Sequence, residues 1–183
     1  LYLWNNSTQD TTVKNILVSY LHPTEPTKSF ESAFGTVSGN DGFGYTLDTK
    51  SAIVLANESS IVDMQISFDF SVAAKGWPDL RVMLGGTINE DANGFTSATG
   101  QDGISISVTS DGQTVSLGIQ SRNDWKSYFS TTLCTYEEFA FDTDYTLTIT
   151  ITGGNQISVK IGTIDQQIIL DDDENITAES ELY

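Results

Sequence analysis

The sequence predicts an all-β protein, built as a two-sheet antiparallel β-sandwich, and three observations lead to this expectation. Apolar and polar residues alternate with a period of two over several stretches, which is typical of strands with one buried face. Gly and Asp turn signals separate these stretches at short intervals, and no amphipathic helix of ordinary length is found. The 183 residues suffice for one continuous core, so we expect a single domain, 1–183.

The most regular stretch runs from Ile61 to Gly86. In its first half every second side chain is apolar, which predicts a long strand with these core positions: Val62, Met64, Ile66, Phe68, Phe70 and Val72. In its second half the core positions are Leu80, Val82 and Leu84. The alternation then places three other side chains on the opposite face of the strand: Trp77, Asp79 and Arg81. A tryptophan, an acid and a guanidinium on one face predict a recognition surface.

The other strands follow the same pattern along the chain. They are expected at 13–20, 43–47, 53–55, 104–108, 115–119, 145–151, 157–161 and 164–170. Turn-forming residues predict turns at 38–42, 110–112 and 153–155. The segment 122–138 breaks the alternation, and no strand is predicted there. Many short strands joined by Gly and Asp turns favour a jelly-roll sandwich.

The composition limits the partners of the protein. Eight Lys and Arg against 25 Asp and Glu give a net charge of -17, which repels nucleic acid and anionic membrane surfaces. Neutral sugars or cations are better partners. No stretch approaches the roughly 18 apolar residues of a membrane span, so no membrane insertion is expected. The single Cys134 excludes a disulfide framework and a classical zinc site. We expect a module of a longer, multidomain chain that is exported to the extracellular space or cell surface.

A succession of segments resembles a known superfamily. The order of these segments resembles the concanavalin A/laminin-G-like superfamily: FDFSV, RVMLGG, a loop ending in Asn-Gly-Phe, GISISVTSDGQTVSLGI and DYTLTITITGGNQISVKI. The resemblance covers roughly Thr27 to Leu170 and implies a two-sheet jelly roll that is commonly used for carbohydrate binding. Among bacterial members the chain is most similar to carbohydrate-binding modules attached to secreted glycoside hydrolases.

The amino-terminal segment departs from the pattern of that superfamily. Such domains usually close with a strand packed beside the first, yet here Val13 to Val18 has the closing pattern. The chain also begins Leu1-Tyr2, as it ends Leu182-Tyr183. Two interpretations stay open: residues 1–22 supply the closing strand of a permuted domain or of one unit of an array, or the chain simply has an ordinary first strand.

Carbohydrate binding requires aromatic rings that stack on the C–H faces of sugars and planar polar groups that bond their hydroxyls. Residues of these types predict a ligand site on the face away from the core: Trp77, Asp79, Arg81, Gln120, Arg122, Trp125 and Tyr128. The open alternative is that the two tryptophans cap the ends of the sandwich and that Arg81 pairs with an acid such as Asp79. Trp4 is expected to be a packing residue.

No catalytic residues are predicted. A glycosidase needs two carboxylates at a defined separation across one bond, and the three acids on one strand face of jelly-roll glucanases are absent. Asp63 and Asp69 share a strand face, which we interpret as solvated. The only histidine, His22, lies in a connector that contains two of the three prolines, and it has no evident nucleophile to activate.

Calcium is the one cofactor for which the sequence has a motif. The loop from Asn89 to Gly94 places oxygen-bearing side chains at alternate positions before a glycine, which predicts these metal ligands: Asn89, Asp91 and Asn93. Position 12 of the motif is Gly100 rather than a bidentate Glu, so the motif is half complete. The acidic run 171–175 is a second candidate. The family resemblance implies a calcium ion with a structural role.

Three function classes follow. The leading expectation is a non-catalytic carbohydrate-binding module of a secreted or surface bacterial protein, with a polysaccharide or glycan as partner. The first alternative is a structural or adhesive repeat of a bacterial surface protein. The second alternative is a glycoside hydrolase or lyase of the same fold.

Overall fold

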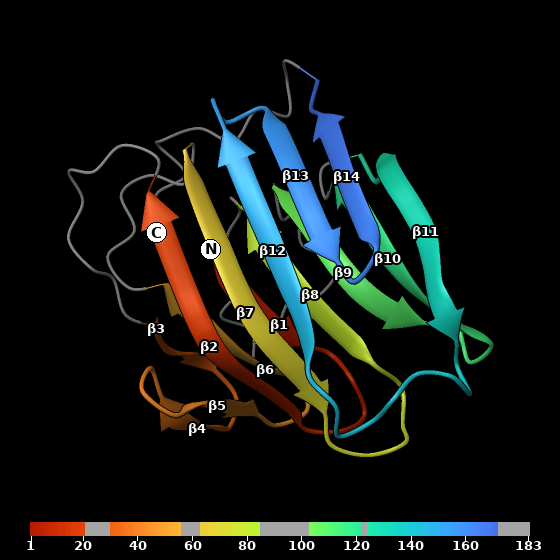
Figure 1. The fold of residues 1–183 in the computed structure, drawn as a ribbon. Coiled ribbons are helices and arrows are strands. Elements are labelled where there is room, and N and C mark those ends of the chain that lie inside the picture. Colours follow the sequence, from red (N-terminus) through yellow and green to blue (C-terminus); the bar gives the residue numbers. More distant parts are fainter. Residues whose placement is uncertain (21–29, 56–62, 85–102, 122–123, 172–183) are drawn as a thin grey trace.

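The computed structural model describes residues 1–20, 30–55, 63–84, 103–121 and 124–171. All regular structure in these residues is β, arranged as fourteen strands in two antiparallel sheets that face each other (Figure 1). The two-sheet β-sandwich predicted from the sequence is therefore confirmed. The described residues contain no helix that could cross a bilayer.

Sheet A has the strand order β11-β10-β9-β8-β1-β6-β3. Its strands are β1 (Tyr2–Asn5), β3 (Phe30–Phe34), β6 (Ser51–Leu55), β8 (Asp79–Leu84), β9 (Ile104–Ser110), β10 (Thr114–Ser121) and β11 (Ser127–Thr135). Sheet B has the strand order β14-β13-β12-β7-β2-β5-β4. Its strands are β2 (Thr11–Tyr20), β4 (Val37–Asn40), β5 (Gly44–Leu47), β7 (Met64–Val72), β12 (Tyr145–Thr152), β13 (Gln156–Ile161) and β14 (Ile164–Ile169).

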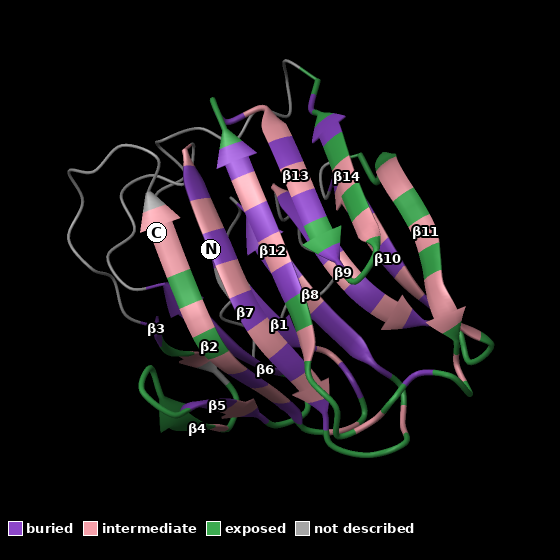
Figure 2. Ribbon diagram, in the orientation of Figure 1, coloured by how far each residue is buried: buried purple, intermediate pink, exposed green. Residues whose placement is uncertain are grey.

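The core lies between the two sheets and follows the predicted alternation. Along β7 every second residue is buried, from Met64 to Val72, and the residues between them are half-buried (Figure 2). The chain places β7 in the interior of sheet B, where Phe68 lies opposite Leu147 of β12. From sheet A the three predicted core residues of β8 join the same cluster: Leu80, Val82 and Leu84. The apolar side chains of β7 thus lie at the centre of the sandwich, because β2 and β12 pair with β7 on its two sides.

The first two strands are internal strands, one in each sheet. β1 pairs with β6 on one side and β8 on the other, whereas β2 pairs with β5 and β7. Residues 13–20 therefore lie beside the long central strand (Figure 1). This position is compatible with an ordinary strand and with a closing strand, so the permutation hypothesis stays a prediction.

Four strands lie where the sequence predicts none: β1, β3, β4 and β11. The last two show the physical reasons most clearly. β11 lies inside the segment 122–138, where the alternation breaks, and it forms the edge of sheet A. Its pairing with β10 shifts register twice, so that Tyr128 and Phe129, although consecutive, both pack against the core. A bulge resets the inward and outward parity, and this removes the period-two signal. β4 occupies most of the predicted turn at 38–42, and the turn itself lies at residues 41–43.

Candidate functional site

An uncharged polar surface covers the outer side of β9, β10 and β11. The register aligns the outward positions in three rows across these strands: Thr109, Ser116 and Thr132; Ser107, Gly118 and Ser130; Ser105, Gln120 and Ser127. We call this surface the polar face of sheet A. Its β11 positions are exposed and most of its β9 and β10 positions are half-buried. No residue in the three rows carries a charge, although the chain has a net charge of -17.

The outer side of sheet B is also polar, but its side chains bond to one another. Gln65 Nε2 donates to Thr150 Oγ1 at 2.9 Å, and the hydroxyls of Ser67 and Thr148 lie 2.8 Å apart. In the described part of the chain, no hydrogen bond joins side chains of the polar face of sheet A to each other in this way. Apart from Ser105, which is buried, the hydroxyls of that face are therefore left for water or for a ligand.

Trp77 and Trp125 lie at opposite ends of the polar face. The Trp77 indole packs on the turn between β9 and β10, where a Cβ built on Gly112 would lie 3.1 Å from indole Cζ3. Trp125 lies in the connection between β10 and β11, and its carbonyl accepts a hydrogen bond of 3.0 Å from Gln120 Nε2. The eight residues of β10 separate these ends, a length of about 26 Å at roughly 3.3 Å per residue.

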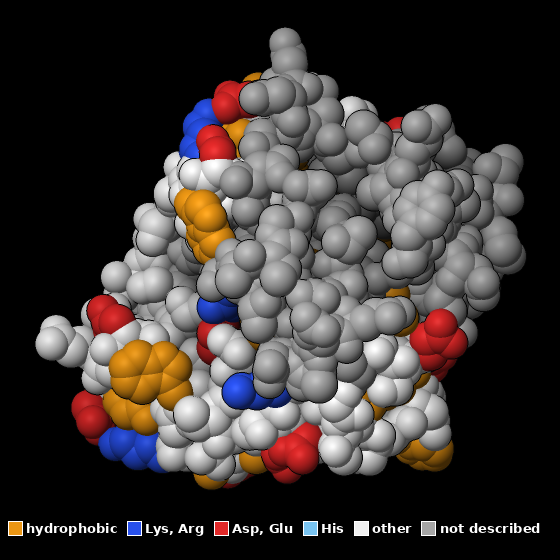
Figure 3. Space-filling model, turned by 180° about the vertical axis from the view of Figure 1, so that it is seen from behind, with side chains coloured by type: hydrophobic (Ala, Val, Ile, Leu, Met, Phe, Trp, Pro, Cys, Tyr) orange, Lys and Arg blue, Asp and Glu red, His pale blue; other side chains and the backbone are white. Residues whose placement is uncertain are grey.

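Both tryptophans are exposed, by 46% for Trp77 and 43% for Trp125. Such exposure leaves ring surface for stacking and is much greater than that of a side chain buried in the core. Figure 3 views the molecule from the side of sheet A. Its described surface is largely white, which marks uncharged polar side chains and backbone, and separate hydrophobic patches lie toward its two ends.

Asp79 and Arg81 form a closed ion pair, as the alternative interpretation of Arg81 expects. Nε and Nη2 of Arg81 donate to the two carboxylate oxygens at 2.7 and 2.8 Å. Asn6 Nδ2 donates to Oδ2 of the same carboxylate at 2.7 Å, and the guanidinium lies 5.1 Å from the centre of the Trp4 ring. Because both oxygens of Asp79 are engaged, this pair holds β8 against the β1 region and offers few hydrogen bonds to a ligand.

Trp4 is a packing residue, as predicted. Its side chain is only 3% exposed and belongs to a second apolar cluster, on the outer side of sheet A, with Ala52, Val54 and Met83. The aromatic ring under the Arg81 guanidinium is thus this packed Trp4 ring, and that contact engages Arg81 within the protein.

Tyr128 lies apart from the other candidates. The bulge in β11 directs its ring toward the core, and its hydroxyl accepts a hydrogen bond of 3.3 Å from Asp171 N. Burial raises the pKa of Tyr128. The Lys126 ammonium lies 4.7 Å from the ring centre and also pairs with Asp171. Tyr128 thus connects the edge strand of one sheet with the end of β14 in the other.

The remaining candidate residues lie outside the described residues. They are Arg122 and the predicted calcium ligands Asn89, Asp91 and Asn93. Among the residues that the structure does describe, no group of three or more His, Cys, Asp or Glu could hold a metal ion. The calcium site stays a prediction from the sequence.

The acids weighed for catalysis have structural partners. Asp69 accepts hydrogen bonds from Thr146 Oγ1 at 2.6 Å and from Asn15 Nδ2 at 2.7 Å, and these bonds lower the pKa of Asp69. Asp63 accepts a hydrogen bond from Gly153 N at 2.7 Å. Each carboxylate thus fastens neighbouring strands or a turn.

Sequence reasoning missed a buried polar centre at Asn5. Its Nδ2 donates to the carbonyls of Gln9, Leu47 and Asp48 at 2.9, 2.8 and 3.1 Å. Its Oδ1 accepts from Ser7 N, Ser7 Oγ and Thr11 Oγ1 at 3.1, 2.6 and 3.0 Å. The side chain is fully buried and ties the end of β1 to the start of β2 and the end of β5. The only sequence signal is the run of polar residues 5–12 between two strands.

Comparison with known proteins does not add to this geometry. No protein-family model matches the chain, and no curated protein or solved structure does so either. The functional conclusion therefore depends on the polar face and its two tryptophans.

Proposed function

We propose that the protein is a non-catalytic carbohydrate-binding module that holds a glycan along the polar face of sheet A. One observation carries the proposal: two exposed tryptophans lie at the ends of an uncharged strip whose hydroxyls do not bond to one another. Sugar rings present C–H faces that stack on indoles, and their hydroxyls exchange hydrogen bonds with Ser, Thr and Gln side chains. A strip about 26 Å long suits an extended oligosaccharide better than a single sugar.

The absence of charge along the three rows favours a neutral glycan. Burying a charged ligand group against uncharged hydroxyls leaves that charge without a partner, which is costly. The net charge of -17 adds a repulsion against acidic sugars. A neutral polysaccharide is therefore the ligand class that the surface accommodates best.

The predicted ligand residues have different parts in this proposal. Trp77 and Trp125 supply the stacking surfaces, and Gln120 lies between them and positions the Trp125 loop. Asp79 and Arg81 keep β8 against the β1 region, and Tyr128 closes the edge of the sandwich. We also propose the jelly-roll connectivity of the concanavalin A/laminin-G-like superfamily and an extracellular location, within a larger chain. Two facing antiparallel sheets support that connectivity only at the level of the sandwich.

An adhesive or structural repeat is the second candidate, and one observation favours it. Phe43 is 89% exposed in the turn between β4 and β5, where the Asn40 side chain accepts hydrogen bonds from Gly42 N and Phe43 N. These two hydrogen bonds fix the turn, and a large apolar side chain exposed on a fixed turn is suited to contact with a neighbouring protein. Phe43 lies beside β4, at the edge of sheet B opposite to β14.

Affinity electrophoresis in gels that contain neutral polysaccharides tests the proposal. The protein should be retarded by at least one polysaccharide, and Trp77→Ala and Trp125→Ala should each weaken binding by about 1–3 kcal/mol, or roughly 5- to 150-fold. Phe43→Ala is the matched control, because it removes an exposed ring remote from the polar face, and its retardation should equal that of the wild type. Migration unaffected by any polysaccharide would instead support the adhesive repeat, and release of reducing sugar would support the hydrolase.

A further inference from the structure

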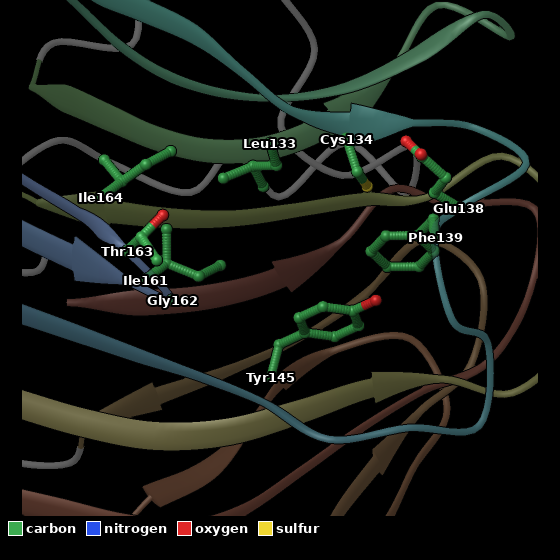
Figure 4. A pocket seen from close by; sticks show the side chains of 9 residues that line it. All are labelled: Leu133, Cys134, Glu138, Phe139, Tyr145, Ile161, Gly162, Thr163 and Ile164. Carbon is green, nitrogen blue, oxygen red and sulfur yellow. The ribbon is translucent and has the colours of Figure 1, made fainter.

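A cavity lies between the two sheets, behind the edge strand β11 and beside the turn that joins β13 to β14 (Figure 4). Its volume is about 220 Å³, which corresponds to roughly seven waters at about 30 Å³ each. A cavity of this size accommodates one aromatic ring or a short alkyl chain. It is too small for the extended glycan proposed above.

The walls of the cavity are mostly apolar, and some of the side chains that form them pack against one another. Phe139 and Tyr145 stack with ring centroids 4.8 Å apart and an interplanar angle of 6°. The Tyr145 hydroxyl accepts a hydrogen bond of 2.8 Å from Ala140 N, which fixes that pair of rings. Figure 4 shows the two rings on one side of the cavity and Ile161 and Ile164 on the other, with Leu133 above the space between them. Apolar ligand surface would thus be removed from water on both sides.

Glu138 is the one charged residue among the described residues that line this cavity. It is exposed at the rim, and Figure 4 shows its carboxylate beside Cys134. Its Oε2 accepts hydrogen bonds from Thr135 N at 3.0 Å and from Thr135 Oγ1 at 2.7 Å. These bonds lower the pKa of Glu138, so the carboxylate stays ionised at neutral pH. Its second oxygen, Oε1, makes no hydrogen bond to any part of the chain that the structure describes. A fixed anion with a free oxygen at the mouth of an apolar cavity complements a ligand that carries one positive charge.

We propose that this cavity binds a small organic cation, with its apolar part between Leu133, Phe139 and Ile164 and its charged group at Glu138. The chemical class is an aryl or alkyl amidinium or ammonium. A neutral analogue of the same shape buries the same apolar surface but lacks the charge-assisted hydrogen bond to Glu138, so it should bind more weakly. An anionic analogue meets the Glu138 carboxylate and the negative charge of the whole protein.

The single cysteine of the chain provides a local readout of occupancy. Cys134 lines the cavity, and burial and the nearby Glu138 raise the pKa of its thiol. Alkylation by iodoacetamide is therefore measured by mass spectrometry at mildly alkaline pH, where enough thiolate is present. Three probes of nearly equal size carry a positive, a zero and a negative charge on the group attached to the ring: benzamidine, benzamide and benzoate. Benzamidine should slow alkylation in a saturable manner, benzamide should do so more weakly, and benzoate should have no effect.

Glu138→Gln and Glu137→Gln form a matched pair of variants. In Glu138→Gln the amide keeps an oxygen that accepts the hydrogen bonds from Thr135, whereas the neighbouring Glu137 pairs with Lys75 at 3.0 Å and does not line the cavity. Both changes remove one negative charge from the protein. Glu138→Gln should weaken benzamidine protection about 1.4-fold to fivefold, the range of an exposed ion pair, and Glu137→Gln should leave it unchanged.

Each variant is compared with its own rate of alkylation without ligand, because removal of the Glu138 charge also alters the thiol. Absence of protection by all three probes would show that the cavity is not a ligand site. Equal protection by benzoate and benzamidine, or equal weakening by the two variants, would overturn the assignment of a cationic ligand. None of these outcomes depends on whether the polar face binds a glycan.

Discussion

Substitution of Asn5 by alanine should strongly destabilise the protein. The side chain makes six hydrogen bonds to five residues around the junction of β1, β2 and β5. Alanine removes both its donor and its acceptor, while four of the five partner residues, all except Asp48, are buried or half-buried. Of these partners the Ser7 hydroxyl keeps two other hydrogen bonds, to the Gln9 carbonyl and from Gln9 N. The Leu47 carbonyl and the Thr11 hydroxyl lose a buried partner.

The magnitude follows from the cost of unpaired buried groups. A buried donor or acceptor left without a partner costs about 1–3 kcal/mol, and the half-buried carbonyls recover part of this from water. We therefore expect a loss of about 3–5 kcal/mol in the free energy of unfolding, against a typical total of about 5–15 kcal/mol. For a domain of this size the melting temperature should fall by roughly 6–20 °C.

Urea unfolding followed by tryptophan fluorescence and circular dichroism measures this loss. Asn5→Asp should be as harmful as Asn5→Ala, because an isosteric carboxylate cannot donate to three carbonyl oxygens. Asn40→Ala is the control, since Asn40 also accepts two backbone hydrogen bonds but is exposed at the end of β4, and it should cost about 1 kcal/mol or less. A loss below about 1 kcal/mol for Asn5→Ala, with an unchanged urea dependence, would refute the reasoning.

Three further predictions concern the metal, the amino terminus and acid stability. If Asn89, Asp91 and Asn93 bind calcium, excess chelator should lower the melting temperature, and identical melts with calcium and chelator would contradict this. Deletion of residues 1–22 removes one internal strand from each sheet and should abolish cooperative unfolding; an equally stable truncated protein would be incompatible with the described sheets. The lowered pKa of Asp69 stabilises the protein above the ordinary carboxyl value of 3.8, and this contribution is lost as the pH falls through the lower value of the folded state. Asp69→Asn should therefore lose less stability than the wild type between about pH 5 and pH 2, and equal losses would argue against it.

The sequence predicts the strands wherever one face of a strand is buried without interruption. β7 and β12 show this best, because both are flanked on each side by other strands and alternate buried with half-buried positions over most of their length. β11 fails the same test for two physical reasons: it is an edge strand, and two bulges change which residues point inward. A search for period-two alternation does not find such a strand, because each bulge reverses which residues face the core.

The candidate site could be predicted only in part. Strand parity correctly places Arg81 and Gln120 away from the main core, but parity does not reveal which partner a charged residue has. Asp79 lies two residues from Arg81 on the same strand face, so the two pair with each other. The sequence does not distinguish the hydroxyls of the polar face, because Ser and Thr also fill the outer side of sheet B. Only the hydrogen bonds of the folded protein show that the sheet B hydroxyls are paired.

Chemical-shift mapping with a neutral oligosaccharide from a retained polysaccharide tests the central proposal most directly. We predict shifts of the Trp77 and Trp125 indole N–H signals and of backbone amides along β10 and β11, with small changes on the outer side of sheet B around Ser67 and Thr148. Shifts confined to sheet B, or to the cavity around Phe139, would contradict a binding surface on the polar face of sheet A.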